Sequence, residues 1–185
     1  LGGPKTDVDM RQLAFWVDAV GDFGKFYVGG TAAYVSGDDP GTADKAEGGT
    51  LSGGLDWNPA LILFNNDMTY WQGGQWGAGG VATTTAGPFV NGYFLQVRAG
   101  VRPVEKLDIM ASLSWAHAEH NALNFDQSRD YGYEVDLTAT YKITNNLSYM
   151  LGGAYLFTGD WFKEGQTGVE LTNNFLVLNK LTLTF

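Results

Sequence analysis

The sequence predicts an all-β fold, an antiparallel up-and-down β-barrel whose strands cross a membrane. Apolar and polar residues alternate along segments of about ten residues, as they do in a strand with two different faces. Short turns and long polar loops alternate along the chain. The sequence ends on another alternating segment, Leu181-Thr182-Leu183-Thr184-Phe185, whose last residue is aromatic.

Composition supports a single domain of unusual character. The chain has 185 residues, with 26 glycines, 14% aromatic and only 17% charged residues. The absence of cysteine excludes disulfides and thiolate chemistry, and a net charge of −9 argues against nucleic acid as a partner. No run of about 18 apolar residues predicts a transmembrane helix. A mean hydropathy of −0.13 still suits a barrel, because only every second strand residue faces lipid.

Two strands are predicted at the start of the chain, at residues 11–20 and 25–35. The first alternates Leu13, Phe15 and Val17 with polar or small residues, and residues 21–24 make a tight turn. The second has Phe26 and Tyr34 near its two ends, where aromatic side chains suit a membrane boundary.

A long extracellular loop is predicted at residues 36–90, where the alternation fails and Gly, Asp, Asn and Thr accumulate. Residues 61–64 could form an element of their own within it. Trp57, Trp71 and Trp76 with Tyr70 could stack on sugar rings or fold into the barrel mouth as a constriction. Four carboxylates could bind a cation such as Ca²⁺, although a solvated acidic loop is favoured because no EF-hand spacing is present: Asp38, Asp39, Asp44 and Glu47.

Five further strands are predicted at residues 91–102, 107–118, 131–142, 147–157 and 175–185. Residues 103–106 and 143–146 form short turns, and residues 119–130 and 159–173 form polar loops. The clearest strand, 131–142, sets Tyr131, Tyr133 and Val135 on one face and Glu134 and Asp136 on the other. All short turns therefore lie on one side of the barrel and all long loops on the other.

The predicted strands number about seven, an odd count. Bacterial single-chain barrels close with an even number, and an open edge in lipid leaves backbone groups unpaired. We therefore expect residues 1–185 to be the C-terminal part of a larger barrel. The alternative is a complete eight-stranded barrel with its first strand within residues 1–11.

The polar face of these strands predicts a water-filled interior. Charged residues that line a pore bias the passage of ions by sign, so these positions would set selectivity. Arg98 and Arg102 could attract anions, but pairing with Asp108, Glu134 or Asp136 is favoured. The predicted pore-lining residues are Asp18, Lys25, Arg98, Arg102, Asp108, Glu134, Asp136, Lys142 and Lys180.

Metal and enzyme chemistry are not expected, and no cofactor is predicted. His117 and His120 are three residues apart, so on a strand they point to opposite faces and suit a rim position better than a metal site. Ser112 and Ser114 lie on the face opposite to His117, and no nucleophile-elbow or zinc-helix motif occurs.

The ending LTLTF resembles the C-terminal signal of bacterial outer-membrane β-barrels, with Leu181, Leu183 and Phe185 as its apolar residues. With the turn asymmetry, it makes the chain similar to the C-terminal half of a porin-like barrel. This resemblance implies an outer-membrane location, a periplasmic C-terminus that the barrel-assembly machinery reads, and passive diffusion of small hydrophilic solutes or ions. A structural or adhesive barrel, acting through its extracellular loops or as a scaffold for a partner protein, is the alternative. A homo-oligomer or a partner protein is a candidate partner in either case. Asn179 departs from the pattern on the presumed lipid face, which a bulge or a subunit contact would explain.

Overall fold

The computed structural model describes residues 7–51, 57–65, 89–121, 128–162 and 172–185. In these ranges the elements in chain order are β1 (Asp9–Met10), β2 (Ala14–Asp22), β3 (Phe26–Val35), β4 (Lys45–Ala46), β5 (Gly92–Val104), β6 (Leu107–Ala118), β7 (Asp130–Lys142), β8 (Leu147–Thr158), the 3-10 helix η3 (Asp160–Phe162) and β9 (Asn174–Leu183). No helix within these ranges is long and apolar enough to cross a membrane.

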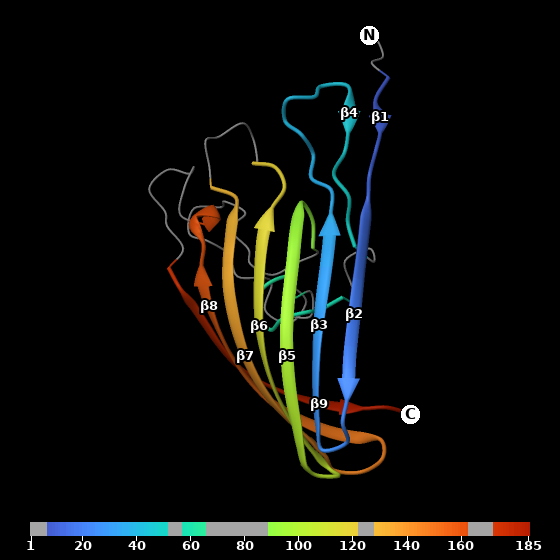
Figure 1. Ribbon diagram of the computed structural model, residues 1–185, viewed down its shortest axis with the longest axis vertical. Coiled ribbons are helices and arrows are strands. Elements are labelled where there is room, and N and C mark those ends of the chain that lie inside the picture. Colours follow the sequence, from blue (N-terminus) through green and yellow to red (C-terminus); the bar gives the residue numbers. More distant parts are fainter. Residues whose placement is uncertain (1–6, 52–56, 66–88, 122–127, 163–171) are drawn as a thin grey trace.

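Seven of the strands form one sheet in the order β2-β3-β5-β6-β7-β8-β9, and every neighbouring pair is antiparallel (Figure 1). Because spatial order follows chain order, the prediction of an all-β, up-and-down antiparallel sheet is confirmed. The short turns lie at one end of the sheet, here named the turn side (Figure 1). The longer connections lie at the other end, the loop side.

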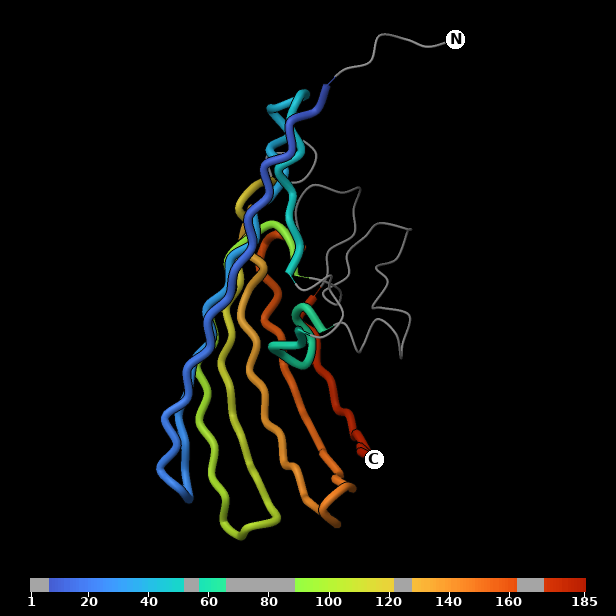
Figure 2. The backbone as a smooth tube through the Cα atoms, turned by 90° about the vertical axis from the view of Figure 1, so that its right-hand side faces the viewer, coloured from blue at the N-terminus to red at the C-terminus, as the bar shows by residue number. Residues whose placement is uncertain are grey.

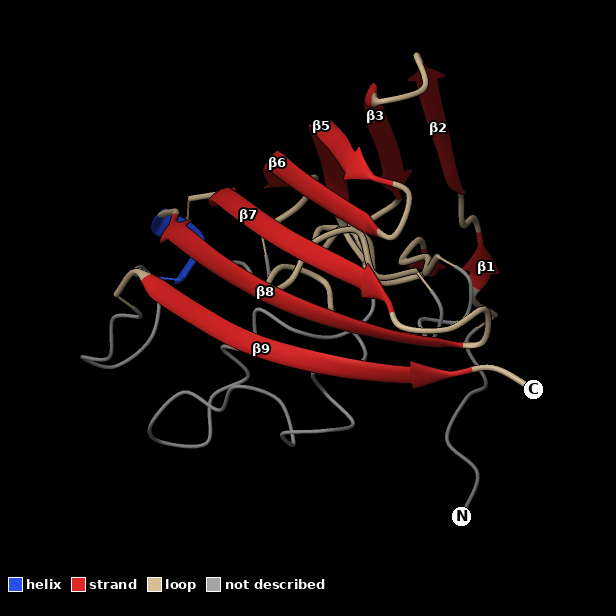
Figure 3. Cartoon of the chain, turned by 90° about the horizontal axis from the view of Figure 1, so that it is seen from below, coloured by secondary structure: helices blue, strands red, loops and turns tan. Residues whose placement is uncertain are grey.

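The sheet is strongly curved but open, with β2 and β9 as its edges (Figure 3). The described strands therefore do not close a barrel. Residues 9 and 10 do not supply an eighth strand of this sheet either, because β1 pairs in parallel with β4 outside it. Both edge strands run from the loop side toward the turn side (Figure 1).

Strand ends agree closely with the predicted ones, except at β2, which begins at Ala14 rather than residue 11. The ladder with β3 stops at the pair Ala14 and Val35. Beyond it, the Ser36 N–H donates to the Leu13 carbonyl at 2.8 Å, and the Ser36 hydroxyl accepts the Leu13 N–H at 2.9 Å. The side chain of Ser36 thus replaces the next ladder bond and ends the strand pairing.

A bulge in β7 turns Tyr131 to the face opposite to the one predicted. The register with β6 shifts between Ala116 and His117, and Gly132 adopts φ 107°. Tyr131 is consequently buried on the concave face, where its ring lies 5.5 Å from that of Phe64, while Tyr133 remains exposed on the convex face. Simple alternation assigned both tyrosines to one face because it does not include a bulge.

The core occupies the loop-side half of the concave face. Residues 57–65, here named the inner segment, lie against this face (Figure 2). Their side chains Ile62, Leu63 and Phe64 pack with Phe94 and Leu156 of the sheet. The predicted element at residues 61–64 is neither strand nor helix but a turn, in which Phe64 has φ 55°.

The rest of the predicted loop 36–90 is described only in part. Residues 45 and 46 form β4, an element that the sequence pattern did not predict. Residues 52–56 and 66–88, which include Tyr70, Trp71 and Trp76, lie outside the described residues.

We predict that Gly132→Ala lowers the free energy of unfolding by roughly 2 kcal/mol or more, because an L residue is strained at this φ and its Cβ would overlap the Phe157 carbonyl oxygen. Gly153→Ala is the matched control on the neighbouring strand, since its nearest neighbour would be the Leu176 carbonyl oxygen at 3.9 Å. Urea titration in detergent micelles, followed by tryptophan fluorescence, measures both. Equal effects for the two variants would contradict the bulge.

Candidate functional site

The two faces of the sheet differ in chemistry along every strand from β3 to β9. On the convex face, large apolar side chains such as Val97, Leu137 and Leu151 are exposed. On the concave face, polar side chains such as Gln96, Ser112 and Thr138 are buried. Apolar side chains are thus exposed along the convex face, whereas on the concave face they are concentrated in the loop-side half, where the inner segment covers them.

Aromatic side chains border the apolar convex face at both ends. Each of the seven strands contributes one near the loop side: Phe15, Tyr34, Tyr93, Trp115, Tyr133, Phe157 and Phe175. A turn-side group consists of Phe23, Phe26, Tyr141 and Tyr149. On β7, the eight residue steps from Tyr133 to Tyr141 span about 27 Å along the strand. A tilt of about 40° reduces this to roughly 20 Å, close to the height of the apolar band of outer-membrane barrels.

The concave face carries an ion pair between Arg98 and Asp18. The guanidinium donates from Nη1 and Nη2 to the two carboxylate oxygens at 2.7 and 2.8 Å. The Thr31 hydroxyl donates to Asp18 Oδ2 at 2.6 Å and accepts from Arg98 at 2.9 Å. Arg98 therefore has Asp18 as its partner rather than Glu134 or Asp136, so its charge is offset within the wall.

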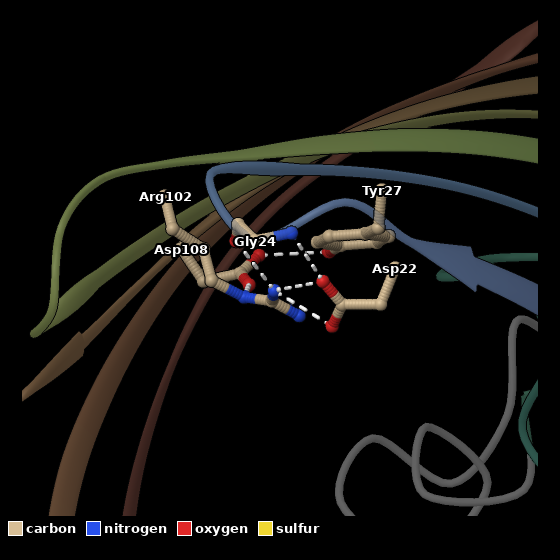
Figure 4. Close-up of polar contacts among 5 residues, drawn as sticks. All are labelled: Asp22, Gly24, Tyr27, Arg102 and Asp108. Atoms are coloured by element: carbon tan, nitrogen blue, oxygen red, sulfur yellow. Dashed lines mark hydrogen bonds and ion pairs between the residues drawn. The ribbon is translucent and has the colours of Figure 1, made fainter.

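A second ionic cluster lies nearer the turn side (Figure 4). Arg102 donates to Asp22 at 2.9 and 3.1 Å, to Asp108 at 3.2 Å and to the Gly24 carbonyl at 3.0 Å. The Tyr27 hydroxyl donates to Asp108 at 2.8 Å, and the guanidinium lies 4.7 Å from the centre of the Tyr27 ring. The predicted pairing of Arg102 with Asp108 is therefore present, with Asp22 as a second partner.

Glu134 and Asp136 face inward, as predicted, but the inner segment covers them. Their exposed fractions are 0% and 3%. Glu134 accepts the backbone N–H groups of Ile62 and Leu63, both at 2.6 Å. The Ser112 hydroxyl donates to Asp136 at 3.0 Å. The interior is thus not water-lined at these positions, and Glu134 instead satisfies the backbone of a turn that lacks regular hydrogen bonding.

Gln96 holds the other end of the inner segment. Its side-chain amide donates to the Pro59 carbonyl at 2.5 Å and to the Ser114 hydroxyl at 3.1 Å. Contacts from β5 and β7 therefore hold the inner segment at Pro59 and at Ile62 and Leu63.

The predicted inward lysines lie toward the turn side. Lys142 ends β7 and Lys180 precedes the end of β9, and both share the alternation of the concave face. Lys25 lies in the connection between β2 and β3. All three side chains are exposed.

The acidic residues of the first loop serve mainly as turn acceptors. Asp38 accepts the Glu47 N–H at 2.8 Å and Asp39 accepts the Gly41 N–H at 2.8 Å. Glu47 accepts the Thr42 hydroxyl at 3.0 Å, and Asp44 is exposed. In the described ranges, no three His, Cys, Asp or Glu side chains are grouped as metal ligands.

The predicted rim residues are held by local contacts. The His117 ring stacks on Trp115 at 5.7 Å. The backbone of His120 exchanges two hydrogen bonds with the Asn91 side chain, at 2.8 and 2.9 Å. Trp57 packs against Phe89 and Phe94, so its role is in the core.

The C-terminal strand keeps its alternation to the end of β9. Leu181 and Leu183 are exposed on the convex face, and Phe185 follows the strand fully exposed. Asn179 lies on the same face opposite Leu151 in an uninterrupted ladder. The explanation of Asn179 by a bulge is therefore wrong.

Four polar residues that bind the charged wall or the inner segment were missed as site residues: Tyr27, Thr31, Gln96 and Ser112. Strand alternation places each on the concave face, so this signal could have found them. Nothing in the sequence marks residues 57–65 as the partner of Glu134, because that contact joins residues more than seventy positions apart.

Comparisons with protein-family models, with curated proteins and with solved structures found no match for this chain.

We predict that Glu134→Ala destabilises the inner segment, because two buried N–H donors lose their acceptor at about 1–3 kcal/mol each. Hydrogen exchange at the amides of Ile62 and Leu63 should accelerate at least tenfold. Thr138→Ala, on the same strand and face, is the control and should leave both amides protected. Unchanged exchange in Glu134→Ala would show that the carboxylate does not hold the turn.

Proposed function

We propose that this chain forms part of the wall of a porin-like β-barrel in the bacterial outer membrane, which lets small hydrophilic solutes or ions diffuse through its interior. The observation that carries the proposal is the apolar convex face, bordered by aromatic residues on all seven strands at the loop side. Soluble monomers rarely expose contiguous apolar patches above roughly 300–600 Å². Lipid is the environment that suits such a face.

A closed barrel would need further strands that pair with the two open edges of the sheet. Unpaired N–H and C=O groups along β2 and β9 would each cost several kcal/mol in hydrocarbon. Since β2 and β9 run in the same direction, an all-antiparallel closure requires an odd number of further strands between them.

The charged residues of the concave wall are an argument for the proposed passage of polar species. It carries the Arg98 and Arg102 ion-pair clusters toward the turn side, while the inner segment fills the loop-side half. In a closed barrel the inner segment would form the narrowest part and the ionic clusters would line the path beyond it. Complete filling of the interior would instead favour the structural or adhesive barrel.

Planar lipid bilayers test the proposal with the full-length protein. We expect stepwise, ion-carrying conductance events from folded protein and none from heat-denatured protein at equal concentration. Insertion is verified separately by protease protection in liposomes. Inserted protein without stepwise currents would exclude the pore and leave the structural or adhesive barrel.

A further inference from the structure

Charged side chains are segregated between the two ends of the sheet. The described loop-side segments, residues 7–13, 36–51, 119–121, 128–130 and 159–162, contain nine Asp and Glu but only three Lys and Arg. The turn-side segments, residues 22–25, 102–108, 140–147 and 180–185, contain five Lys and Arg and three Asp and Glu. Within the described segments, side-chain charge is thus strongly negative at one end of the sheet and positive at the other.

The positive end owes its charge to exposed lysines. Arg102 is already offset by Asp22 and Asp108, at 2.9 and 3.2 Å. The other cations in the turn-side segments are Lys25, Lys106, Lys142 and Lys180, all exposed and each next to or within a turn-side strand end. Lys142 and Lys180 lie on the concave face, so their charge is directed toward the interior of the sheet.

We infer that this separation of charge makes the proposed pore rectify ionic current. The inference rests on the proposed pore function. An acidic mouth concentrates cations and a basic mouth concentrates anions. When the loop-side compartment is positive, the voltage drives cations from the acidic mouth and anions from the basic mouth toward the middle of the pore. Mobile ions therefore accumulate inside the pore. The opposite polarity drives both ions outward and depletes the pore.

Current–voltage curves of the full-length protein in planar bilayers test the inference. In about 0.1 M KCl, where the Debye length is about 10 Å, the current should be at least about 1.5-fold larger with the loop side positive. In about 1 M KCl, where it is about 3 Å, the ratio should approach unity. The chain lacks cysteine, so Ala43→Cys on the exposed loop side, labelled with an impermeant thiol reagent, reports the orientation.

A variant with Lys25, Lys106, Lys142 and Lys180 all changed to Gln should lose most of the asymmetry while it still conducts. Lys45→Gln, the loop-side lysine, is the control and should keep the asymmetry. Symmetric curves in about 0.1 M KCl, a reversed sense, or asymmetry that does not fall with salt would each overturn the inference while the pore stands. Absence of any stepwise current from inserted protein would overturn the pore and the inference together.

Discussion

The period of two in the antiparallel backbone ladder is the constraint on which the rest of this structure depends. Each strand is hydrogen-bonded on both sides from β3 to β8, so its side chains alternate strictly between two faces. Apolar residues occupy one face in phase over seven strands, and the other face is polar except in its loop-side half, where residues such as Phe94 and Leu156 pack with the inner segment. A single slip in register would exchange the two faces of a strand, so the common phase selects this pairing.

The inner face illustrates how a polar wall is kept in order. Arg98 and Arg102 on β5 pair with Asp18 and Asp22 on β2, across the intervening strand β3, and Gln96 and Glu134 direct their polar groups to the backbone of the inner segment. Side-chain acceptors are needed there because a turn that packs against the face of a sheet has backbone N–H donors that no neighbouring strand accepts. Gln96 and Glu134 therefore hold the inner segment against the sheet.

Prediction from sequence succeeded where local periodicity decides the outcome and failed where distant segments meet. All seven sheet strands were predicted, and β6 has the predicted limits, residues 107 and 118. The face of Tyr131 was predicted wrongly because the bulge at Gly132 interrupts the alternation. Burial of Glu134 was not predictable, because it depends on a turn of irregular backbone far away in the chain. Among the charged residues, Arg102 pairs with the predicted Asp108, whereas Arg98 pairs with Asp18 on β2, across the intervening strand β3.

Contact between the convex face and lipid can be measured with spin labels placed at single cysteines from residue 133 to residue 141 of β7. The full-length protein is reconstituted in lipid vesicles, and the accessibility of each label to oxygen and to a water-soluble nickel complex is measured. We expect oxygen accessibility to alternate with a period of two, high at odd positions such as Val135 and Leu137 and low at even positions such as Glu134 and Asp136. No alternation, or odd positions that the nickel complex reaches, would contradict contact between this face and lipid.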